Sequence, residues 1–444
     1  MSRQTSTDRI CLTLPTNREC SRTIVAMGEE AVYAARTFGV EVELVILDSC
    51  DEETWAEHAR VVAALPAVEH VNVHHLNEAR QRDFLAGAIR EAGLDAPDRI
   101  LDLMLPDALS YGACTNRAFL IASALGCRSM HRRDSDSNYQ VLDGEQIFPI
   151  HHEVMSLSRP ATDAAAGVSE TDLDPAHTHR PVSMVGASFI GELSVDIAEI
   201  EQLDAGIYHD VVSLWAPGDW SDEQKRALVD ESFRGAGTDP FTGDHSTLTL
   251  VDPMRVDMLN ISFDQGVYER IPLPPATNTI GSDYFLIHVV HDAQLPGVLH
   301  NRHIENFYTP ERRTDAGFVA YQLRFVKFLL SMLYLNFVYD RMGTAGAGTL
   351  LDDQEHVSGD VFAALIREST SLDRTENLWR LDRVSTSYRK LGGRYEEFAA
   401  LLDERRDQLL DEAEWDMRDF ALLIDVWPAL VRAARDTGLG SADG

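Results

Sequence analysis

The chain has 444 residues, 44% of them hydrophobic, which is enough for a main folded domain with additions. It carries 72 acidic against 39 basic residues, a formal net charge of −33 at pH 7. This excess of negative charge argues against a nucleic-acid partner and against docking on an anionic membrane, because both need a basic surface.

The first elements of the chain are typical of a parallel sheet. An apolar run at residues 10–14 predicts a strand, residues 21–38 predict a helix, and the apolar run at residues 42–47 predicts a second strand. Polar residues follow each strand directly: a loop at residues 15–18 after the first, and Asp48 after the second. Strand, helix and strand in this order form a βαβ unit, whose ligands bind at the carboxyl ends of the strands.

A pair of carboxylates follows the next predicted strand. A helical segment at residues 115–125 leads into a strand-like run at residues 128–132. Asp134 and Asp136 then follow, separated only by Ser135. Two acids one residue apart on a turn can share one hard divalent cation, which prefers oxygen ligands and also binds a diphosphate. The alternative is a solvated acidic turn. Because all three polar clusters follow predicted strands, we expect them to converge on one crevice.

Beyond residue 140 the pattern changes. Residues 158–181 are rich in Ala, Asp, Thr and Pro without periodicity, which predicts a flexible loop. Strands are expected at residues 182–190 and 247–251. Between them, Ser221 and Gln224 have the spacing of a capping box and predict the start of a helix.

The last part of the chain is predicted to be helical. After a Gly- and Asp-rich loop at residues 343–359, apolar residues recur at spacings of three and four. These helices are expected to pack on the longest apolar stretch, residues 325–339, and are candidates for a homodimer contact. Lys327 and Asn336 interrupt that stretch, which is shorter than the roughly 18–20 residues that cross a bilayer. We therefore expect a buried helix and no membrane span.

A second polar region lies further along the chain. Within residues 300–313, three arginines and two histidines stand against two acids in a strongly acidic protein. Arginine forks match phosphate oxygens, so Arg302 and Arg312 are candidates for binding a diphosphate. The region also holds two H-x-x-H pairs, a weak zinc pattern without cysteine, made of His288, His291, His300 and His303.

In residues 8–140 the order of these motifs resembles the GT-A glycosyltransferases, in particular the family-2-like enzymes. In that family the first strand ends in a P-T-x-N/R-type loop and the second in an Asp, and a G-x-x-x-x-N-R-like helix start precedes the D-x-D pair. The matching residues are Pro15, Thr16, Asn17, Arg18, Asp48, Tyr111, Gly112, Asn116, Arg117, Asp134 and Asp136. The chain departs from the family after Asp48, where many relatives read D-x-S-x-D and this sequence reads D-S-C-D.

The resemblance implies an α/β fold of the GT-A type, a Rossmann-like and mostly parallel sheet flanked by helices, with an α-helical C-terminal extension. Residues 8–140 would form the half that binds the nucleotide sugar, residues 141–341 the acceptor-binding half, and residues 342–444 the extension. Asp48 would hold the base or ribose. The donor contacts would come from Pro15, Thr16, Asn17, Arg18, Asp48, Asn116, Arg117, Asp134, Arg302 and Arg312.

The resemblance also implies a metal site and a catalytic acid. Asp134 and Asp136 would bind Mn²⁺ or Mg²⁺ together with the diphosphate of the nucleotide sugar. Relatives often place an acid near the acceptor, and further along a histidine that completes the metal sphere. By order, Asp283 matches the acid, which would be the base if the reaction inverts. His300 matches the histidine, and His303 is the alternative ligand.

The sequence thus predicts a metal-dependent glycosyltransferase that moves a sugar from a nucleoside-diphosphate sugar to a soluble acceptor, such as a small metabolite, natural product or peptide. A nucleotidyltransferase of related fold and a non-catalytic scaffold are the alternatives. The chain has no P-loop, no G-x-G-x-x-G after the first strand and no G-x-S-x-G, which argues against a classical dinucleotide enzyme and an α/β-hydrolase. Five cysteines without a C-x-x-C pair, and an N-terminus without an apolar signal segment, predict a cytoplasmic protein.

Overall fold

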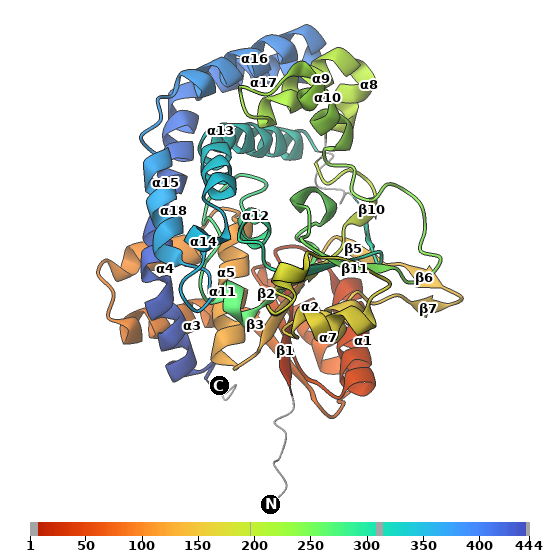
Figure 1. Ribbon diagram of the computed structural model, residues 1–444. Helices are drawn as coiled ribbons and strands as arrows, with labels where there is room; N and C mark the ends of the chain where they lie inside the picture. Colours follow the sequence, from red (N-terminus) through yellow and green to blue (C-terminus); the bar gives the residue numbers. More distant parts are fainter. Residues whose placement is uncertain (1–7, 196, 308–313, 441–444) are drawn as a thin grey trace, which may run out of the picture.

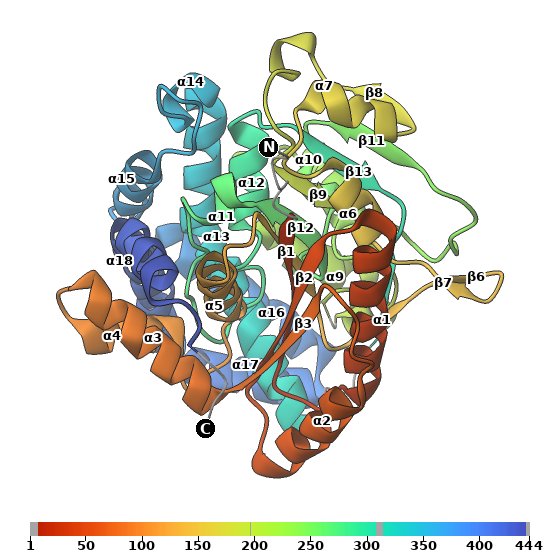
Figure 2. The ribbon, with the colours of Figure 1, turned by 90° about the horizontal axis from the view of Figure 1, so that it is seen from below.

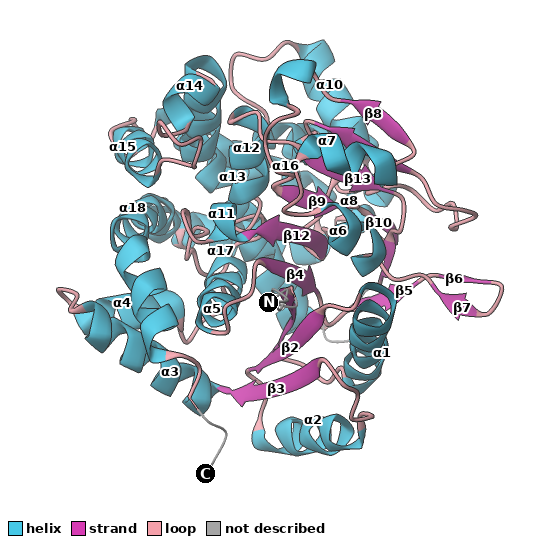
Figure 3. Cartoon of the chain, turned by 60° about the horizontal axis from the view of Figure 1, so that its bottom comes forward, coloured by secondary structure: helices cyan, strands magenta, loops and turns pink. Residues whose placement is uncertain are grey.

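The computed structural model describes residues 8–195, 197–307 and 314–440. Its central sheet contains nine strands: β1 (Arg9–Thr16), β2 (Glu41–Asp48), β3 (Val71–Asn77), β4 (Ser129–Arg133), β8 (Glu170–Asp172), β9 (Met184–Gly186), β11 (Ser246–Thr249), β12 (Asn260–Asp264) and β13 (Gly297–His300). Their order across the sheet is β3-β2-β1-β4-β12-β9-β13-β11-β8 (Figure 3). Neighbours are antiparallel where β12 pairs with β4 and β9, and where β11 pairs with β13. All other pairings are parallel, so the sheet is mostly parallel.

Helices cover both faces of the parallel strands β1 to β4. These helices are α1 (Ser21–Phe38), α2 (Glu52–Ala64), α3 (Glu78–Ala92), α4 (Pro97–Met104) and α5 (Tyr111–Ala124). The first two lie on one face and the other three on the opposite face (Figure 2). Alternation along β1 explains the two layers, because Ile10, Leu12 and Leu14 pack with α1 while Cys11 joins the cluster of α3 and α5.

The start of α5 is held directly against the chain at residues 273–274. A Cβ atom on Gly112 would lie 1.9 Å from the carbonyl oxygen of Pro274, so only glycine permits this approach. One turn further, the Asn116 amide donates to the Leu273 carbonyl at 2.9 Å and accepts from the Leu273 N–H at 2.7 Å. Gly112 and Asn116, which the sequence analysis matches to a G-x-x-x-x-N-R-like helix start, therefore serve in packing α5 here.

Residues 137–306 complete the sheet and add shorter elements. These are β5 (Ser137–Tyr139), β6 (Val141–Leu142), β7 (Glu145–Gln146), α6 (Ile150–Ser156), α7 (Ala161–Ala164), η1 (Ala165–Gly167), η2 (Pro175–His177), β10 (Phe189–Gly191), α8 (Ala198–Leu203), α9 (Ala205–Val212), η3 (Ser213–Trp215), α10 (Asp222–Glu231), η4 (Pro253–Arg255), α11 (Gln265–Tyr268), α12 (Phe285–Asp292) and β14 (Ile304–Asn306). A small sheet has the order β10-β14-β5, and β6 pairs with β7. The strand expected at residues 182–190 is thus two strands, β9 and β10, in different sheets.

The segment 158–181, which the sequence predicts as a flexible loop, contains regular structure. It includes α7, η1, β8 and η2, and β8 forms the edge of the main sheet beside β11. Ala161, Ala164 and Leu173 are buried in a small apolar cluster with residues of β9, β11 and β13. In the sequence these alanines have the composition of a linker, and only tertiary packing shows that they are buried.

The C-terminal part is helical, as predicted. Its helices are α13 (Asp315–Ala345), α14 (Ala347–Leu350), α15 (Gly359–Ser369), α16 (Thr375–Leu391), α17 (Gly393–Glu404) and α18 (Arg406–Thr437). α13 runs between the sheet and the pair α16–α17, and α15 lies beside α18 (Figure 1). Within the described residues, α13 is the one helix long and apolar enough to cross a membrane, yet 72% of its most apolar window is buried inside the protein.

Polar contacts tie the C-terminal helices to the rest of the chain. Nζ of the buried Lys327 on α13 donates to the Thr277 carbonyl and pairs with Asp416 of α18, both at 2.8 Å. Nε1 of the buried Trp427 on α18 donates to the Tyr268 carbonyl at 3.0 Å. One apolar cluster extends from α3 and α5 through α13 to α18, so the C-terminal helices share the main core. The expected α/β fold with a mostly parallel sheet and a helical C-terminal extension is confirmed.

Candidate active site

A cavity of about 780 Å³ lies at the carboxyl ends of β1, β2 and β4. Its lining includes residues from all three strand ends: Pro15, Thr16, Asn17 and Arg18 at the end of β1, Ser49 after β2, and Asp134, Ser135 and Asp136 after β4. Small-molecule sites are typically clefts of about 300–1,000 Å³. The structure therefore brings two of the three predicted clusters together in a space of the right size for a ligand.

Arg132, the last but one residue of β4, organises the acidic turn. Its Nε and Nη2 atoms both lie 3.0 Å from Oδ1 of Asp134, and its Nη1 lies 2.6 Å from Oδ2 of Asp283. Thr115 of α5 accepts a further hydrogen bond at 3.1 Å. Burial by itself lowers the pKa of Arg132, but the two carboxylates outweigh it and hold that pKa well above its usual value. Arg132 is thus a permanent cation that fixes Asp134 and Asp283.

The second acid of the turn faces the loop after β1. Nη1 of Arg18 lies 3.0 Å from Oδ2 of Asp136. The loop is braced by Thr16, whose hydroxyl donates to the Arg18 carbonyl at 2.8 Å, and the turn by Thr23, whose hydroxyl donates to the Ser135 carbonyl at 3.2 Å. Strand alternation sends the neighbouring Arg133 to the other face of the sheet, where it pairs with Glu30 and Glu153.

Asp257 and Tyr284 also line the cavity, and the sequence analysis did not single them out. The Tyr284 hydroxyl donates to Oδ2 of Asp257, and the Leu259 N–H donates to Oδ1 at 3.2 Å. Burial raises the pKa of Asp257 to about 6, and the charges of Asp134 and Asp283 add to this rise. A carboxyl group of this pKa in a cavity is suited to exchanging protons near neutral pH. Nothing in the sequence distinguishes Asp257 from the other acids.

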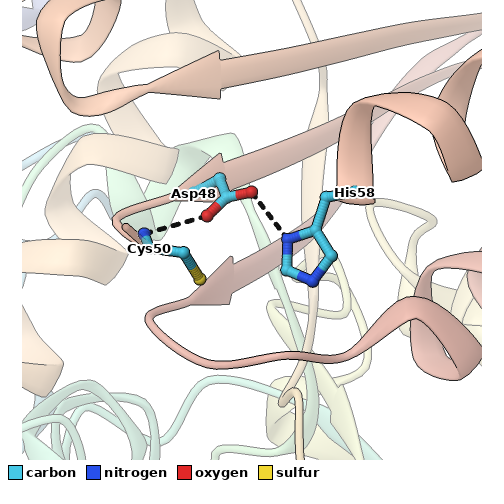
Figure 4. A group of neighbouring side chains, drawn as sticks. All are labelled: Asp48, Cys50 and His58. Carbon is cyan, nitrogen blue, oxygen red and sulfur yellow. Dashed lines mark hydrogen bonds and ion pairs between the residues drawn. The ribbon is translucent and has the colours of Figure 1, made fainter. Parts of the chain in front are cut away.

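Asp48 does not line the cavity, although Ser49 beside it does. Its Oδ2 accepts a hydrogen bond from His58 at 2.7 Å, and its Oδ1 accepts from the Cys50 N–H at 3.0 Å (Figure 4). His75 donates a further hydrogen bond to Oδ2 at 2.9 Å. Burial alone raises the pKa of Asp48, but these hydrogen bonds outweigh it and hold the pKa far below its usual value. The sequence predicts that Asp48 holds the base or ribose, whereas in the structure both of its carboxylate oxygens are engaged inside the protein.

Asp48, Cys50 and His58 are the one group in the described part of the chain whose three ligand atoms lie close enough to share a metal ion. The hydrogen bonds favour a different role. The Cys20 N–H donates to Nε2 of His58 at 3.0 Å, while Nδ1 of the same ring contacts Asp48. Both ring nitrogens are therefore occupied, and we interpret the group as a buried anchor that links the end of β2 to α2.

Asn116 and Arg117, both expected to contact the donor, have different positions. Asn116 is fully buried and bound to the Leu273 main chain, so it supports α5 and does not line the cavity. Arg117 lines the cavity, with Nε bound to Gln81 at 2.8 Å and Nη1 to the Met104 carbonyl at 2.7 Å. Burial lowers the pKa of Arg117 from its usual value.

The histidine and arginine region after β13 is not brought to the acidic turn. His300 is buried against His152, with ring centres 5.2 Å apart, and Arg302 forms an ion pair with Asp244 at 2.6 Å. His303 accepts from the Ser188 N–H at 3.2 Å. None of these three residues lines the cavity, although the sequence predicts a role in metal binding for His300 and in diphosphate binding for Arg302. Arg312 lies outside the described residues.

Fold and site together define an α/β protein with a carboxylate-rich ligand cavity at the ends of its parallel strands. The chain belongs to the family of unknown function DUF6271, whose model matches residues 8–443. A search of curated proteins finds no match.

Several solved structures are similar to the chain at low identity. A mannosyltransferase from Pyrobaculum calidifontis in complex with GDP-Man and Mn²⁺ has 12% identity and a TM-score of 0.35, over 99% of this chain and 89% of the other. TarS 1-349 of S. aureus has 12% identity and a TM-score of 0.35, over 92% and 90%. Mannosyl-3-phosphoglycerate synthase from Rubrobacter xylanophilus has 12% identity and a TM-score of 0.31, over 72% of both chains. At these values, the function of this chain has to be derived from its own residues.

Proposed function

We propose that the protein is a glycosyltransferase that takes a sugar from a nucleoside-diphosphate donor. The observation that carries this proposal is the meeting of the loop after β1 with the Asp134–Asp136 turn in one cavity, where Arg18 and Asp136 form an ion pair. A diphosphate at the ends of parallel strands needs polar groups from more than one strand end, and this arrangement supplies them.

The residues at the turn fit a divalent cation. Oδ1 of Asp134 is occupied by Arg132, whereas its Oδ2 has no hydrogen bond to any residue that the structure describes. Within the described residues, the carboxylates of Asp134, Asp136 and Asp283 pair with the guanidinium groups of Arg18 and Arg132 and gather at one end of the cavity. Asp134 and Asp136 would hold Mn²⁺ or Mg²⁺, hard ions that prefer oxygen ligands. A bound ion would supply Lewis-acid stabilisation of the departing diphosphate.

The protein itself supplies orientation and fixed charge. Arg117 is held by Gln81 and the Met104 carbonyl and adds a preorganised positive charge to the cavity wall. Arg132 holds Asp134 and Asp283 at fixed positions, so these carboxylates need no rearrangement when a substrate binds. Groups that are already in place at the reacting atoms lower the barrier without a cost of reorganisation.

Two carboxylates of the cavity can accept the proton of the acceptor. Asp283 matches the family order, but its Oδ2 is ion-paired with the buried Arg132 at 2.6 Å. Within the described residues, the Asp257 carboxylate forms no ion pair and accepts only from the neutral donors Tyr284 and Leu259. Asp257 has a pKa of about 6 because of burial, and a general base works best when its pKa lies near the working pH. We therefore assign the role of general base to Asp257. Asp283 would instead hold Arg132 in position.

Calorimetric titration of UDP and GDP into the full chain, with and without Mn²⁺, tests the proposal. We expect one of the two nucleotides to bind, and to bind more tightly when Mn²⁺ is present. A panel of nucleotide sugars then identifies the sugar by slow donor hydrolysis. Absence of binding by every nucleoside diphosphate at millimolar concentration with Mn²⁺ would contradict the proposed function.

A further inference from the structure

The same cavity has a second, apolar part between α13 and the segment from η3 to α10. We call it the aromatic subsite and define it by Trp215, Trp220, Phe233, Phe328, Met332 and Leu335. It contrasts with the acidic turn, because none of these side chains carries a charge. A ligand that fills the whole cavity therefore meets a polar end and an apolar end.

One face of α13 forms a continuous wall of this subsite. Tyr321, Phe328, Met332, Leu335 and Tyr339 all line the cavity and follow one another at spacings of seven, four, three and four residues. Residues at these spacings lie on one side of a helix. The wall is thus part of a rigid helix and not of a loop.

The opposite wall is aromatic and already packed. The ring centres of Trp215 and Phe233 lie 5.3 Å apart. Trp215 also packs edge-to-face against Phe328, with ring centres 5.8 Å apart. A Cβ atom on Gly281 would lie 3.0 Å from the Phe328 ring, which shows how closely the chain fits around it. Trp220 has no such ring partner in the described residues, and this residue is 37% exposed.

Three polar side chains of the cavity lining, those of Asn336, Asn306 and Tyr321, already have partners within the protein. The side-chain amide of Asn336 donates to the Trp215 carbonyl at 3.0 Å, and that of Asn306 donates to the Glu192 carbonyl at 2.9 Å. The Tyr321 hydroxyl donates to the Ser194 carbonyl at 3.3 Å. A glycan needs many donors and acceptors for its hydroxyl groups, and a site that leaves them unpaired rejects it.

We infer that the aromatic subsite binds the acceptor, and that the acceptor is an uncharged small molecule with an apolar aromatic or fused ring that carries the reacting hydroxyl. This inference rests on the proposed function, since it names the acceptor of that transfer. The hydroxyl oxygen bonds to the anomeric carbon while the bond from that carbon to the diphosphate breaks. The electron pair leaves with the diphosphate, and the hydroxyl proton passes to a carboxylate of the cavity.

Binding of 2-naphthol to the full chain in the absence of nucleotide tests the inference, with calorimetry as the measurement. Trp220→Ala should weaken binding about tenfold, because an exposed stacking partner is lost, and Trp220→Phe should stay within about threefold of the unchanged chain. Trp379→Ala is the matched control, because Trp379 is 54% exposed on α16 and does not line the cavity. It should bind 2-naphthol like the unchanged chain.

Methyl α-glucoside and 1-octanol serve as the competing ligand classes. Binding of either as tight as that of 2-naphthol overturns the inference, and so does a Trp220→Ala chain that binds 2-naphthol unchanged. Binding of UDP and GDP is measured in parallel. Nucleotide binding without ring binding refutes only the acceptor class, whereas ring binding without nucleotide binding refutes the proposed function.

Discussion

Nη1 of Arg132 lies 2.6 Å from Oδ2 of Asp283, an ion pair between residues 151 positions apart in the chain. The same guanidinium group contacts Asp134 at 3.0 Å. One buried arginine thus connects two carboxylates to which the sequence assigns separate tasks. Their positions relative to each other, and to any substrate in the cavity, depend on this side chain.

Replacing Arg132 by methionine should lower the free energy of unfolding by about 3–5 kcal/mol, because it leaves buried carboxylates without their partner. Arg132→Lys should lose less stability, since lysine keeps the positive charge and lacks only the forked guanidinium group. Urea denaturation measures both. Arg60→Met is the control, because Arg60 is 74% exposed, and it should change stability by less than about 0.5 kcal/mol. Equal stability of Arg132→Met and the unchanged chain would show that the ion pairs are not formed in solution.

Asp136→Ala should abolish the Mn²⁺-dependent part of nucleotide binding, and Asp134→Ala should weaken it less. Both acids line the cavity and are ion-paired, Asp136 with Arg18 and Asp134 with Arg132, so each variant should also lose about 1–3 kcal/mol of stability. Asp95→Ala, an exposed acid in the loop before α4, is the control and should bind nucleotide normally. Calorimetric titration of UDP and GDP in the presence of Mn²⁺ measures the affinity. Unchanged affinity in the Asp136→Ala chain would contradict the metal site proposed at this turn.

Asp257→Asn should reduce the rate of sugar transfer by about 10²–10⁴-fold, the usual contribution of a general base. In the unchanged chain the rate should rise with pH through about 6, the pKa to which burial raises Asp257. The variant should lose this rise. A pH–rate profile measures it. A profile of Asp257→Asn that keeps the rise, while Asp283→Asn loses it, would move the role of the base to Asp283.

Asp257→Asn should slow sugar transfer, but it should stabilise the folded chain at high pH. The pKa of Asp257 is raised to about 6 in the folded chain, so between about pH 4 and 6 the folded state binds more protons than the unfolded state. The contribution of Asp257 to stability therefore falls as pH rises through this range. At pH 8, Asp257→Asn should be more stable than the unchanged chain, by at most about 3 kcal/mol. Thermal unfolding at pH 4 and pH 8 compares the two, and a difference that does not grow with pH would refute it.

Asp48→Ala should lower the stability of the fold and leave the affinity for nucleotide unchanged. The change removes the acceptor of buried hydrogen bonds from His58 and His75 and should cost about 2–4 kcal/mol at pH 7. Because the pKa of Asp48 is lowered in the folded chain, its contribution is present above about pH 4 and is lost as pH falls further. Denaturant unfolding at pH 7 and pH 3 measures this.

Nucleotide affinity provides the contrast for Asp48→Ala. The folded fraction of this variant should bind UDP or GDP as the unchanged chain does, since Asp48 does not line the cavity. Zn²⁺ should not raise the melting temperature of the unchanged chain, because both ring nitrogens of His58 are hydrogen-bonded. Selective loss of nucleotide binding at full stability would restore the role that the sequence suggested for Asp48.

The parallel part of the sheet, and the edge at which the cavity lies, could be predicted from the sequence. β1 and β2 are buried on both faces, so they are continuous apolar runs, and the polar residues that end them are easy to locate. The helical C-terminal part and its packing on the apolar stretch at residues 325–339 were also predictable, because side chains at spacings of three and four need a covering surface. These features are local, or follow from the periodicity of one element.

Which polar residues share the cavity could not be predicted from the sequence, because it depends on tertiary packing. Asp48 and Asp136 both follow a strand in the sequence, yet the neighbouring His58 and His75 engage the first inside the protein, while the second lines the cavity. Asp257 lines the cavity although no motif marks it, and His300 does not, although its order in the chain suggested that it would. The reason is physical: a carboxylate or an imidazole takes its role from the partners that burial brings to it, and those partners come from distant parts of the chain.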